Sequence, residues 1–424
     1  MIDKVGRRRT INNMQVRTGL FLLGLLSVGA GLFLFAQNSF VINLSGRQGT
    51  ASIAINADIE PPKPLANPPT IIKAVYATSW SAGSEKSLSY LIKLINDTEL
   101  NAIVIDVKDF SGYVVYNTDL ELPKKYNAVE LRIPRLNALV KRLHDNNIYV
   151  IGRISTFQDV RLALARPELA LFSSTTGKVW KDNKGLTWMD PASQEVWNYN
   201  IAIAQEILAR GFDEANFDYV RFASDGNLND IRHPVWDEKT LKTKIIRNFF
   251  TYLRQQIPER ISSDLFGLVT VNTDGLGIGQ HLEYALPEFD AIAPMVYPSH
   301  YFKGFIGYEN PAAAPYQIIK YSMDKAIQRI KNFEIAVKKQ DLAAAKAAST
   351  TPTFTYMHHA KLRPWIQDFN LGATYDAVKV RAEIQAWDDA ASTTPQFYGG
   401  WMLWNPSNIY TRAALQAEPV ASNQ

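Results

Sequence analysis

The 424-residue chain contains no cysteine. Disulfide bonds, thiol catalysis and zinc sites with cysteine ligands are therefore excluded. Its six histidines do not form a metal set either, because the adjacent His358 and His359 would point to opposite faces of a strand. We expect neither a metal ion nor another cofactor.

An excess of basic charge is absent from most of the chain. Residues 1–18 hold five basic residues and one acidic residue, which accounts for the entire net charge of +4. The remainder is near neutral, which argues against a nucleic-acid partner. The chain also lacks an internal repeat and a glycine-rich phosphate loop after the first predicted strand. The missing loop disfavours a nucleotide-binding open sheet.

The clearest feature that is present lies near the N-terminus. Residues Gly19 to Ala36 form an eighteen-residue stretch without a charge, which as a helix just spans the hydrocarbon core. The basic cluster Arg7 to Arg9 precedes it, so residues 1–18 are expected to remain in the cytoplasm. The sequence thus predicts a single-pass anchor in the cell membrane at 19–40, with the rest on the extracytoplasmic side. A cleaved signal peptide and a buried core helix are the alternatives.

A linker and a large folded domain follow the apolar stretch. Five prolines fall within residues 56–70, a composition typical of an extended, semi-rigid spacer. We therefore expect a linker at 41–69, a folded domain at 70–412 and a short tail at 413–424.

Strand and helix patterns alternate through this domain. Predicted strands cover 71–78, 101–109, 148–155, 212–222, 261–270, 289–299, 351–359 and 397–405, with a hairpin extension at 112–117. Helices are expected between them, including 86–96, 134–146, 237–256, 315–346 and 375–391, and the Ala/Lys-rich end of 315–346 is expected to be an exposed extension or loop. Eight strands alternating with helices predict an α/β fold, a closed (β/α)8 TIM barrel. A doubly wound open sheet is the alternative.

Polar and aromatic residues gather late in the predicted strands, where barrels of this kind carry their active sites. The predicted substrate-binding residues are Asp106, Lys108, Arg221, Tyr297, His300, Trp365, Gln367, Asp368, Trp401 and Trp404. Such carboxylates, amides and planar rings are suited to binding sugars. Several also have structural interpretations: Asp106 could pair with Lys108, and Trp401 and Trp404 could belong to the core.

Two carboxylates on neighbouring predicted strands are the candidate catalytic pair. Cleavage of a glycosidic bond normally requires one carboxyl group to protonate the leaving oxygen and another to attack or stabilise the anomeric carbon, or to activate water. Asp264 would be the general acid/base and Asp218 the nucleophile or electrostatic stabiliser. The alternative for Asp218 is a structural ion pair with Arg221.

Five ordered motifs resemble a known family. They are VIDVKDFSGYVVY, DEANFDYVRF, APMVYPSHY, LRPWIQDF and GGWMLWNPSNIY. Together they are similar to the motif series of a bacterial family of glycoside-hydrolase-like proteins, over about residues 72 to 412. The resemblance implies a TIM barrel related to the amylase-like clan, in exported or anchored proteins, with Asp218 at the nucleophile position by analogy of fold. The chain departs from the family pattern at Ala223, where proline is usual, and in the Ala/Lys-rich segment.

The leading hypothesis is hydrolysis or transglycosylation of an extracellular or cell-wall polysaccharide. The alternative is a non-catalytic carbohydrate-binding or envelope-organising protein on the same scaffold. A third hypothesis, another barrel hydrolase such as a deacetylase, would usually need a metal set that the sequence does not provide. A carboxylate pair at the barrel mouth would favour catalysis, and a lone carboxylate would favour binding.

Overall fold

The computed structural model describes residues 58–351, 353 and 360–417. The predicted cytoplasmic tail, membrane anchor and most of the linker lie outside these residues, as do residues 418–424 and nearly all of the predicted strand at 351–359. Among the helices that are described, none combines the length and apolar character that a membrane crossing requires.

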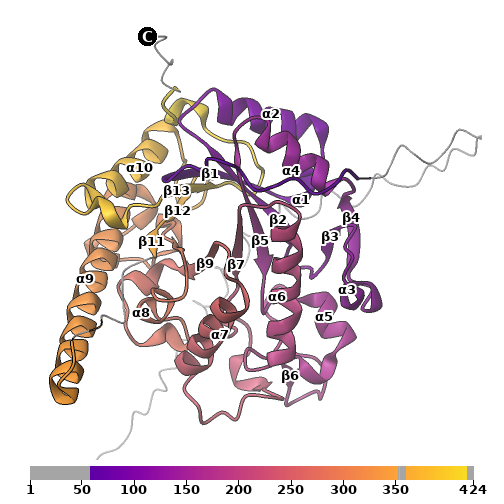
Figure 1. Ribbon diagram of the computed structural model, residues 1–424, viewed down its shortest axis with the longest axis vertical. Helices are drawn as coiled ribbons and strands as arrows, with labels where there is room; N and C mark the ends of the chain where they lie inside the picture. The colour runs from indigo at the N-terminus through magenta and orange to yellow at the C-terminus, as the bar shows by residue number, and fades with distance from the viewer. Residues whose placement is uncertain (1–57, 352, 354–359, 418–424) are drawn as a thin grey trace, which may run out of the picture. The chain divides into compact units, whose positions relative to one another are not determined.

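Parallel strands at eight positions form a closed barrel, as predicted (Figure 1). Strand β1 pairs with both β2 and β13, and these two pairings close the ring. The barrel strands are β1 (Ile72–Ala77), β2 (Ala102–Lys108), β5 (Tyr149–Ser155), β7 (Glu214–Asp218), β9 (Ile261–Phe266), β10 (Ala291–Met295), the pair β11 (Lys361–Leu362) and β12 (Trp365–Gln367), and β13 (Gly400–Trp404).

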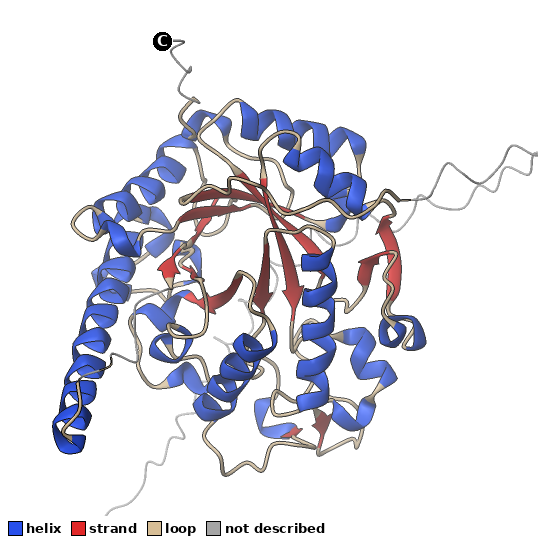
Figure 2. Cartoon of the chain, viewed as in Figure 1, coloured by secondary structure: helices blue, strands red, loops and turns tan. Residues whose placement is uncertain are grey.

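Helices surround the barrel on its outer side (Figure 2). The longer ones are α2 (Glu85–Asn96), α4 (Leu136–His144), α6 (Gln194–Ala209), α7 (Lys242–Gln256), α9 (Pro315–Ala348) and α10 (Ala377–Ala391). The short ones are α1 (Ser79–Ala82), α3 (Glu121–Lys125), α5 (Val160–Ala165) and α8 (Leu282–Ala285). The predicted extension is β3 (Val114–Tyr116), which pairs antiparallel with β2 and parallel with β4 (Val129–Ile133). A separate ribbon joins β6 (Phe172–Ser173) to β8 (Ile231–Arg232).

The core has two layers because strand side chains alternate between the faces of the sheet. In β1, Ala74 and Tyr76 pack inside the barrel with Val104 and Trp365. Their neighbour Val75 packs outward, in the layer that the helices cover. Large inward residues leave no open channel through the barrel, so a ligand site has to lie at one of its ends.

The seventh strand position differs from the sequence interpretation. Strands β11 and β12 occupy it, pairing with β10 on one side and, through β12, with β13 on the other. The sequence interpretation placed this segment, 361–367, after the strand. Arg363 and Pro364 interrupt its apolar pattern, and proline cannot donate a ladder hydrogen bond, so the strand is split into two short pieces.

The Ala/Lys-rich segment is a helical extension rather than a loop. Helix α9 continues to Ala348, and most residues of its last four turns are exposed. The first half of α9 packs on the barrel through residues such as Ile318 and Met323. The prediction of an exposed extension is confirmed.

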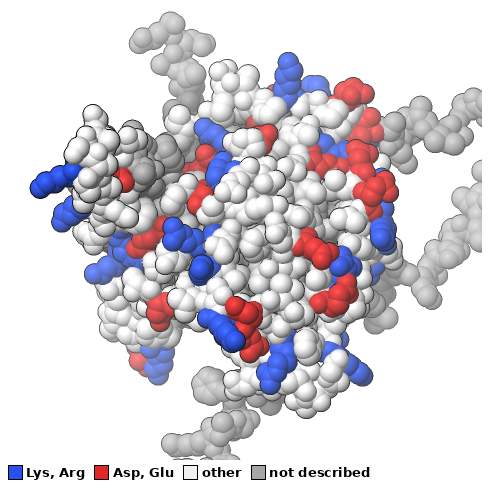
Figure 3. All heavy atoms as spheres, turned by 60° about the horizontal axis from the view of Figure 1, so that its bottom comes forward, with Lys and Arg blue, Asp and Glu red and all other residues white. Residues whose placement is uncertain are grey.

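Charged side chains of both signs mix on the surface. Over the face shown in Figure 3, acidic and basic residues are interspersed around uncharged ones. Some form ion pairs one helical turn apart, such as Lys141 with Asp145 at 2.7 Å. Such exposed pairs contribute little to stability.

Candidate active site

Neighbouring strands bring the two predicted catalytic carboxylates together. Asp218 is the last residue of β7. The register pairs Phe217 of β7 with Ser263 of β9, so Asp218 and Asp264 follow at adjacent positions. On the other side of β7, Asn216 pairs with Arg153 of β5, and Arg153 pairs with Asp106 of β2. The pleat therefore turns these residues of four adjacent strands toward the barrel interior, and their late positions in parallel strands bring them to the same end.

Arg153 connects three of these carboxylates. Its Nη1 donates to Asp106 Oδ1 at 2.5 Å, and its Nη2 donates to Asp218 Oδ2. Its Nε lies 3.7 Å from Asp264 Oδ2. We call these four residues the Arg153 cluster, and all four are buried. Sequence reasoning missed Arg153, although a lone arginine inside the apolar run of β5 was the available signal.

Asp264 lies in an environment that favours its protonated form. Burial, followed by the negative charge of Asp218, raises its pKa to about 8. Its Oδ1 accepts hydrogen bonds from Asn216 Nδ2 at 2.9 Å and Trp365 Nε1 at 2.8 Å. Asp264 therefore carries a proton near neutral pH, whereas Asp218 pairs with a guanidinium. This contrast is typical of an acid and its partner carboxylate.

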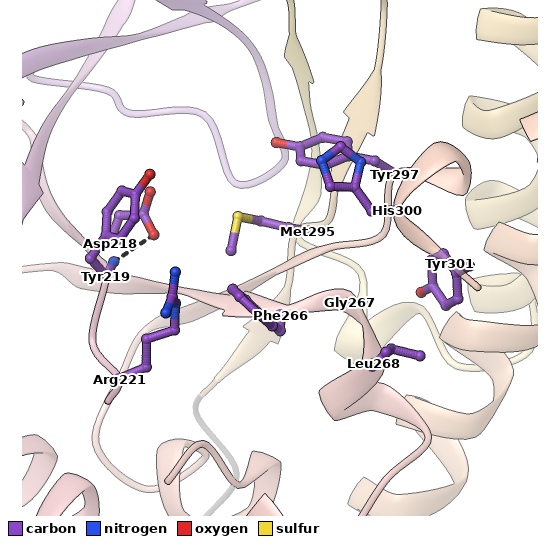
Figure 4. Close-up of a pocket in the computed structure, with 10 residues that line it drawn as sticks. All are labelled: Asp218, Tyr219, Arg221, Phe266, Gly267, Leu268, Met295, Tyr297, His300 and Tyr301. Carbon is purple, nitrogen blue, oxygen red and sulfur yellow. Dashed lines mark hydrogen bonds between the residues drawn. The ribbon is translucent and has the colours of Figure 1, made fainter. Parts of the chain in front are cut away.

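A cavity of about 300 Å³ opens beside Asp218 (Figure 4). Its walls come from the segments after β7, β9 and β10, and the lining residues are Asp218, Tyr219, Arg221, Phe266, Gly267, Leu268, Met295, Tyr297, His300 and Tyr301. The predicted site residues Asp218, Arg221, Tyr297 and His300 thus share one cavity. Among the described residues that line it, Asp218 is the only carboxylate, because Asp264 is 1% exposed and does not reach the wall.

Arg221 enters the cavity because β7 ends at Asp218. Tyr219 has a left-handed φ of 54°, so the alternation of faces stops there. Asp218 is ion-paired, but with Arg153 rather than with Arg221, which corrects the alternative given by the sequence. His300 is exposed at the cavity wall, with its Nδ1 3.1 Å from Ser299 Oγ.

Aromatic rings form a stack beside the Arg153 cluster. Tyr76 and Trp404 stack with ring centroids 3.9 Å apart, and Trp365 meets Trp404 edge-on at 5.5 Å. Tyr76 also donates to Asp106 Oδ2 at 2.5 Å. The Arg153 guanidinium lies 5.2 Å from the Trp404 ring centre, a cation–π distance. Trp404 is partly exposed, so one ring of the stack remains open to a ligand.

Lys108 does not join Asp106, and the predicted Asp–Lys pair at the rim is wrong. Between Asp106 and Lys108 the β2–β5 register shifts, which inserts Val107 as a bulge. A bulge reverses the face on which the next side chain lies. Lys108 therefore points outward, where its Nζ donates to Asp159 at 2.6 Å and to the Ser155 carbonyl at 2.5 Å.

Three other predicted binding residues are placed away from the cavity. Trp401 is fully buried in the layer between barrel and helices, so it offers no surface to a sugar. Gln367 is buried and accepts a hydrogen bond from Ser299 Oγ at 2.8 Å. Asp368 accepts hydrogen bonds from Thr411 N and Oγ1 at 2.8 and 2.6 Å, which ties the segment after β13 to β12. Trp365 does not line the cavity either; it contacts the site through its bond to Asp264 and its edge-on contact with Trp404.

A metal site is not formed by the described part of the chain. Within residues 58–351, 353 and 360–417, no group of three or more His, Asp or Glu side chains could hold a metal ion. His358 and His359 lie outside these residues.

Comparison with solved structures shows similarity to glycoside hydrolase barrels. A hypothetical protein from Ruminiclostridium thermocellum is 38% identical, over 45% of this chain and 96% of that one, with a TM-score of 0.42. The PgaB (BpsB) glycoside hydrolase domain from Bordetella bronchiseptica is 12% identical, over 82% of this chain and all of that domain, with a TM-score of 0.54. At that identity the likeness shows the fold alone.

No curated protein matched the chain, but the sequence does match a protein family. Residues 74–410, which include the whole Arg153 cluster and the cavity, match the family described as "Putative glycosyl hydrolase domain". The match extends over most of the chain, so the protein belongs to this glycosyl hydrolase-like family.

Proposed function

We propose that this protein is a glycoside hydrolase of an extracellular or cell-wall polysaccharide, with Asp218 and Asp264 as its two carboxyl groups. The observation that carries the proposal is their pairing across Arg153. Asp218 opens on the cavity in an ion pair, and Asp264 on the next strand holds a proton near neutral pH. Membership of the glycosyl hydrolase-like family supports the same reaction class.

The proposed mechanism assigns a distinct role to each carboxyl group. Asp264 protonates the leaving oxygen from Oδ2, the oxygen that Asn216 and Trp365 do not engage. Because Asp264 lies behind the cavity wall, this step requires the bound sugar, or one bridging water, to reach Oδ2. Asp218 attacks or stabilises the anomeric carbon from the cavity wall, held by Arg153 and by the Tyr219 N–H at 2.6 Å. Such a pair is the common requirement of glycoside hydrolysis. Trp404 provides a ring on which a sugar can stack.

The predicted membrane anchor at 19–40 supports an extracytoplasmic substrate. We propose that this segment holds the barrel outside the cytoplasmic membrane, because basic residues precede it and a proline-rich spacer follows it. Protease added to intact cells should digest the barrel while leaving a cytoplasmic marker untouched; protection of the barrel would contradict this orientation.

Non-catalytic carbohydrate binding is the second candidate function. The specific observation in its favour is that Asp218 alone among the described carboxylates reaches the cavity wall. In that case the Arg153 cluster would stabilise the barrel and the cavity would hold a sugar without cleaving it.

Carboxamide substitutions distinguish the two functions. We expect the full chain to release reducing ends from one member of a polysaccharide panel. Asp218→Asn and Asp264→Asn should each lower kcat about 10²–10⁴-fold, because each removes the nucleophile or the acid. The wild-type rate should also fall as the pH rises through about 8, where Asp264 loses its proton.

Glu383→Gln is the matched control. Glu383 is buried on α10, and its pKa is likewise raised to about 8 by burial, but it bonds to Tyr375 and the Gln367 N–H outside the cavity. This variant should retain the wild-type rate and the same fall in rate as the pH rises through about 8. Binding of a polysaccharide without turnover would favour the second function, and full activity in both aspartate variants would eliminate the mechanism.

A further inference from the structure

A buried arginine without a carboxylate partner faces the cavity. Arg221 is 7% exposed, yet it lines the cavity next to Asp218. Its Nη1 donates to the Phe222 carbonyl at 3.1 Å and to Ser224 Oγ at 2.9 Å. Among the described residues, no carboxylate lies within ion-pair distance of this guanidinium. Figure 4 shows its nitrogen atoms directed toward the space between Asp218 and Met295.

Aromatic rings hold the guanidinium in place. Its central carbon lies 4.6 Å from the ring centre of Trp188, 4.6 Å from that of Phe266 and 5.4 Å from that of Tyr219. Rings stabilise a cation by about 0.5–2 kcal/mol but accept no hydrogen bond in the plane of the guanidinium group. The N–H groups of Arg221 other than those on Nη1 therefore remain available to a ligand.

Three carboxylates act electrostatically on Arg221, namely Asp218, Asp225 and Asp182, but none forms an ion pair with it. Asp218 accepts hydrogen bonds from Arg153 and from the Tyr219 N–H. The oxygens of Asp182 accept hydrogen bonds from Trp188, Gln158 and two backbone N–H groups. Burial lowers the pKa of Arg221, as expected for a cation whose charge is not neutralised on site.

The other basic side chain that lines the cavity is His300. Desolvation, followed by the charge of Lys184, lowers the pKa of His300. Arg221 is therefore the cation in the cavity lining that an incoming ligand meets, and a negatively charged ligand would be attracted by it.

We propose that Arg221 binds an anionic group on the sugar next to the scissile bond. The substrate would be an acidic polysaccharide that bears carboxylate, phosphate or sulfate groups. The planar fork of arginine matches such oxyanions with two parallel hydrogen bonds. This inference rests on the proposed function, because it names the substrate class of the same cavity.

Binding to charge-matched ligands tests the proposal. The full chain carrying Asp264→Asn, which slows turnover, is titrated calorimetrically with oligomers of glucuronate, galacturonate and mannuronate, and with each oligomer after reduction of its carboxyl groups. Sulfated and phosphorylated oligosaccharides form separate arms that identify the anion. At least one anionic oligomer should bind 10-fold or more tightly than its neutral counterpart.

Arginine variants locate the effect. Adding Arg221→Gln should remove the preference for the charged oligomer, a 10- to 100-fold loss in affinity, because it removes a charge-assisted hydrogen bond. Arg221→Lys should retain part of the preference, since it keeps the charge without the fork. Arg247→Gln is the control: this exposed arginine also lies on a ring, 5.0 Å from Tyr284, but outside the cavity, and its loss should leave binding unchanged.

The outcomes separate this inference from the proposed function. If every anionic oligomer binds no better than its neutral counterpart, the inference is overturned, whether or not the Arg221 variants fold. Cleavage of a neutral polysaccharide that is indifferent to Arg221→Gln would likewise overturn it while retaining the hydrolase. Charge-dependent binding through Arg221 in a wild-type protein without turnover would retain the inference and remove the hydrolase.

Discussion

At the scale of single residues, the protonation of Asp264 is the property on which the chemistry depends. The side chain is buried beside Asp218 and receives two hydrogen bonds, yet burial outweighs both and raises its pKa to about 8. Because its value in an unfolded chain is near 4, the native protein holds an extra proton between about pH 4 and 8. This proton links the site to the stability of the fold.

The linkage gives a signed prediction for stability. Where the native state binds more protons than the unfolded state, the free energy of unfolding falls as pH rises, by at most about 1.4 kcal/mol per pH unit for one group. Asp264→Asn removes this contribution. Urea unfolding at pH 5 and pH 8 should therefore show a larger loss of stability in wild type than in the variant.

Buried carboxyl groups outside the Arg153 cluster do not obscure this comparison. Burial raises the pKa of Glu383 to about 8 and that of Asp368 to about 6, and both remain in the two proteins, so their contributions cancel in the difference. Parallel stability curves for wild type and Asp264→Asn would show that Asp264 does not hold the proton.

At the scale of elements, the bulge in β2 turns side chains before and after it to opposite faces of the strand. Before it, Asp106 faces the barrel interior and Arg153; after it, Lys108 faces outward to Asp159. Asp159 also accepts the Leu162 N–H at 2.7 Å as the N-cap of α5. Because of the bulge, β2 contributes Asp106 to the Arg153 cluster and also binds, through Lys108, the N-cap residue of α5.

Lys108→Met tests this structural role. Removing the cation leaves Asp159 buried without its charged partner, a loss of about 3–5 kcal/mol in the free energy of unfolding. Affinity for the polysaccharide, measured on the folded fraction, should not change. Lys141→Met, which breaks the exposed pair with Asp145, should alter stability by less than about 1 kcal/mol. A loss of affinity without a loss of stability in Lys108→Met would instead mean that Lys108 takes part in ligand binding.

The same elements show what could be predicted from the sequence. Most barrel strands begin as apolar runs such as 102–105, and the polar residues late in the predicted strands placed Asp106, Asp218 and Asp264 at one end of the barrel. The pattern cannot reveal a bulge, because one inserted residue looks like any other, so Lys108 was assigned to the wrong face. The seventh strand was misplaced because Arg363 faces inward to a buried partner, Glu214, and a charged residue there resembles a loop.

At the scale of the whole molecule, the site depends on closure of the ring. The sequence predicted that strand ends converge, but not that one arginine would be shared by acids from three strands, since such sharing depends on the register between neighbours. Closure occurs where β13 meets β1, with Gly400 opposite Ile72. Gly400 has φ of 90°, and a Cβ there would lie 1.9 Å from the Ile72 carbonyl oxygen.

Gly400→Ala should therefore open the barrel at this seam. Gly304→Ala is the matched control, because its φ of 85° is likewise positive while no neighbouring atom lies within 4 Å of the added methyl group. The control should lose about 1–2 kcal/mol of stability, and Gly400→Ala should lose more, by chemical denaturation. Equal losses would mean that the seam can shift to accept a methyl group.

Sharing Arg153 among Asp106, Asp218 and Asp264 has a consequence for any spectroscopic study of the site. The charges of its neighbours act on Asp264, whose pKa Asp218 helps to raise and Arg153 lowers. A probe on Asp264 would therefore report on the whole cluster and not on one isolated group. Replacing Asp218 by asparagine would move the inflection recorded at Asp264 to lower pH, and a constant read from that probe would have meaning only for the cluster in which it was taken.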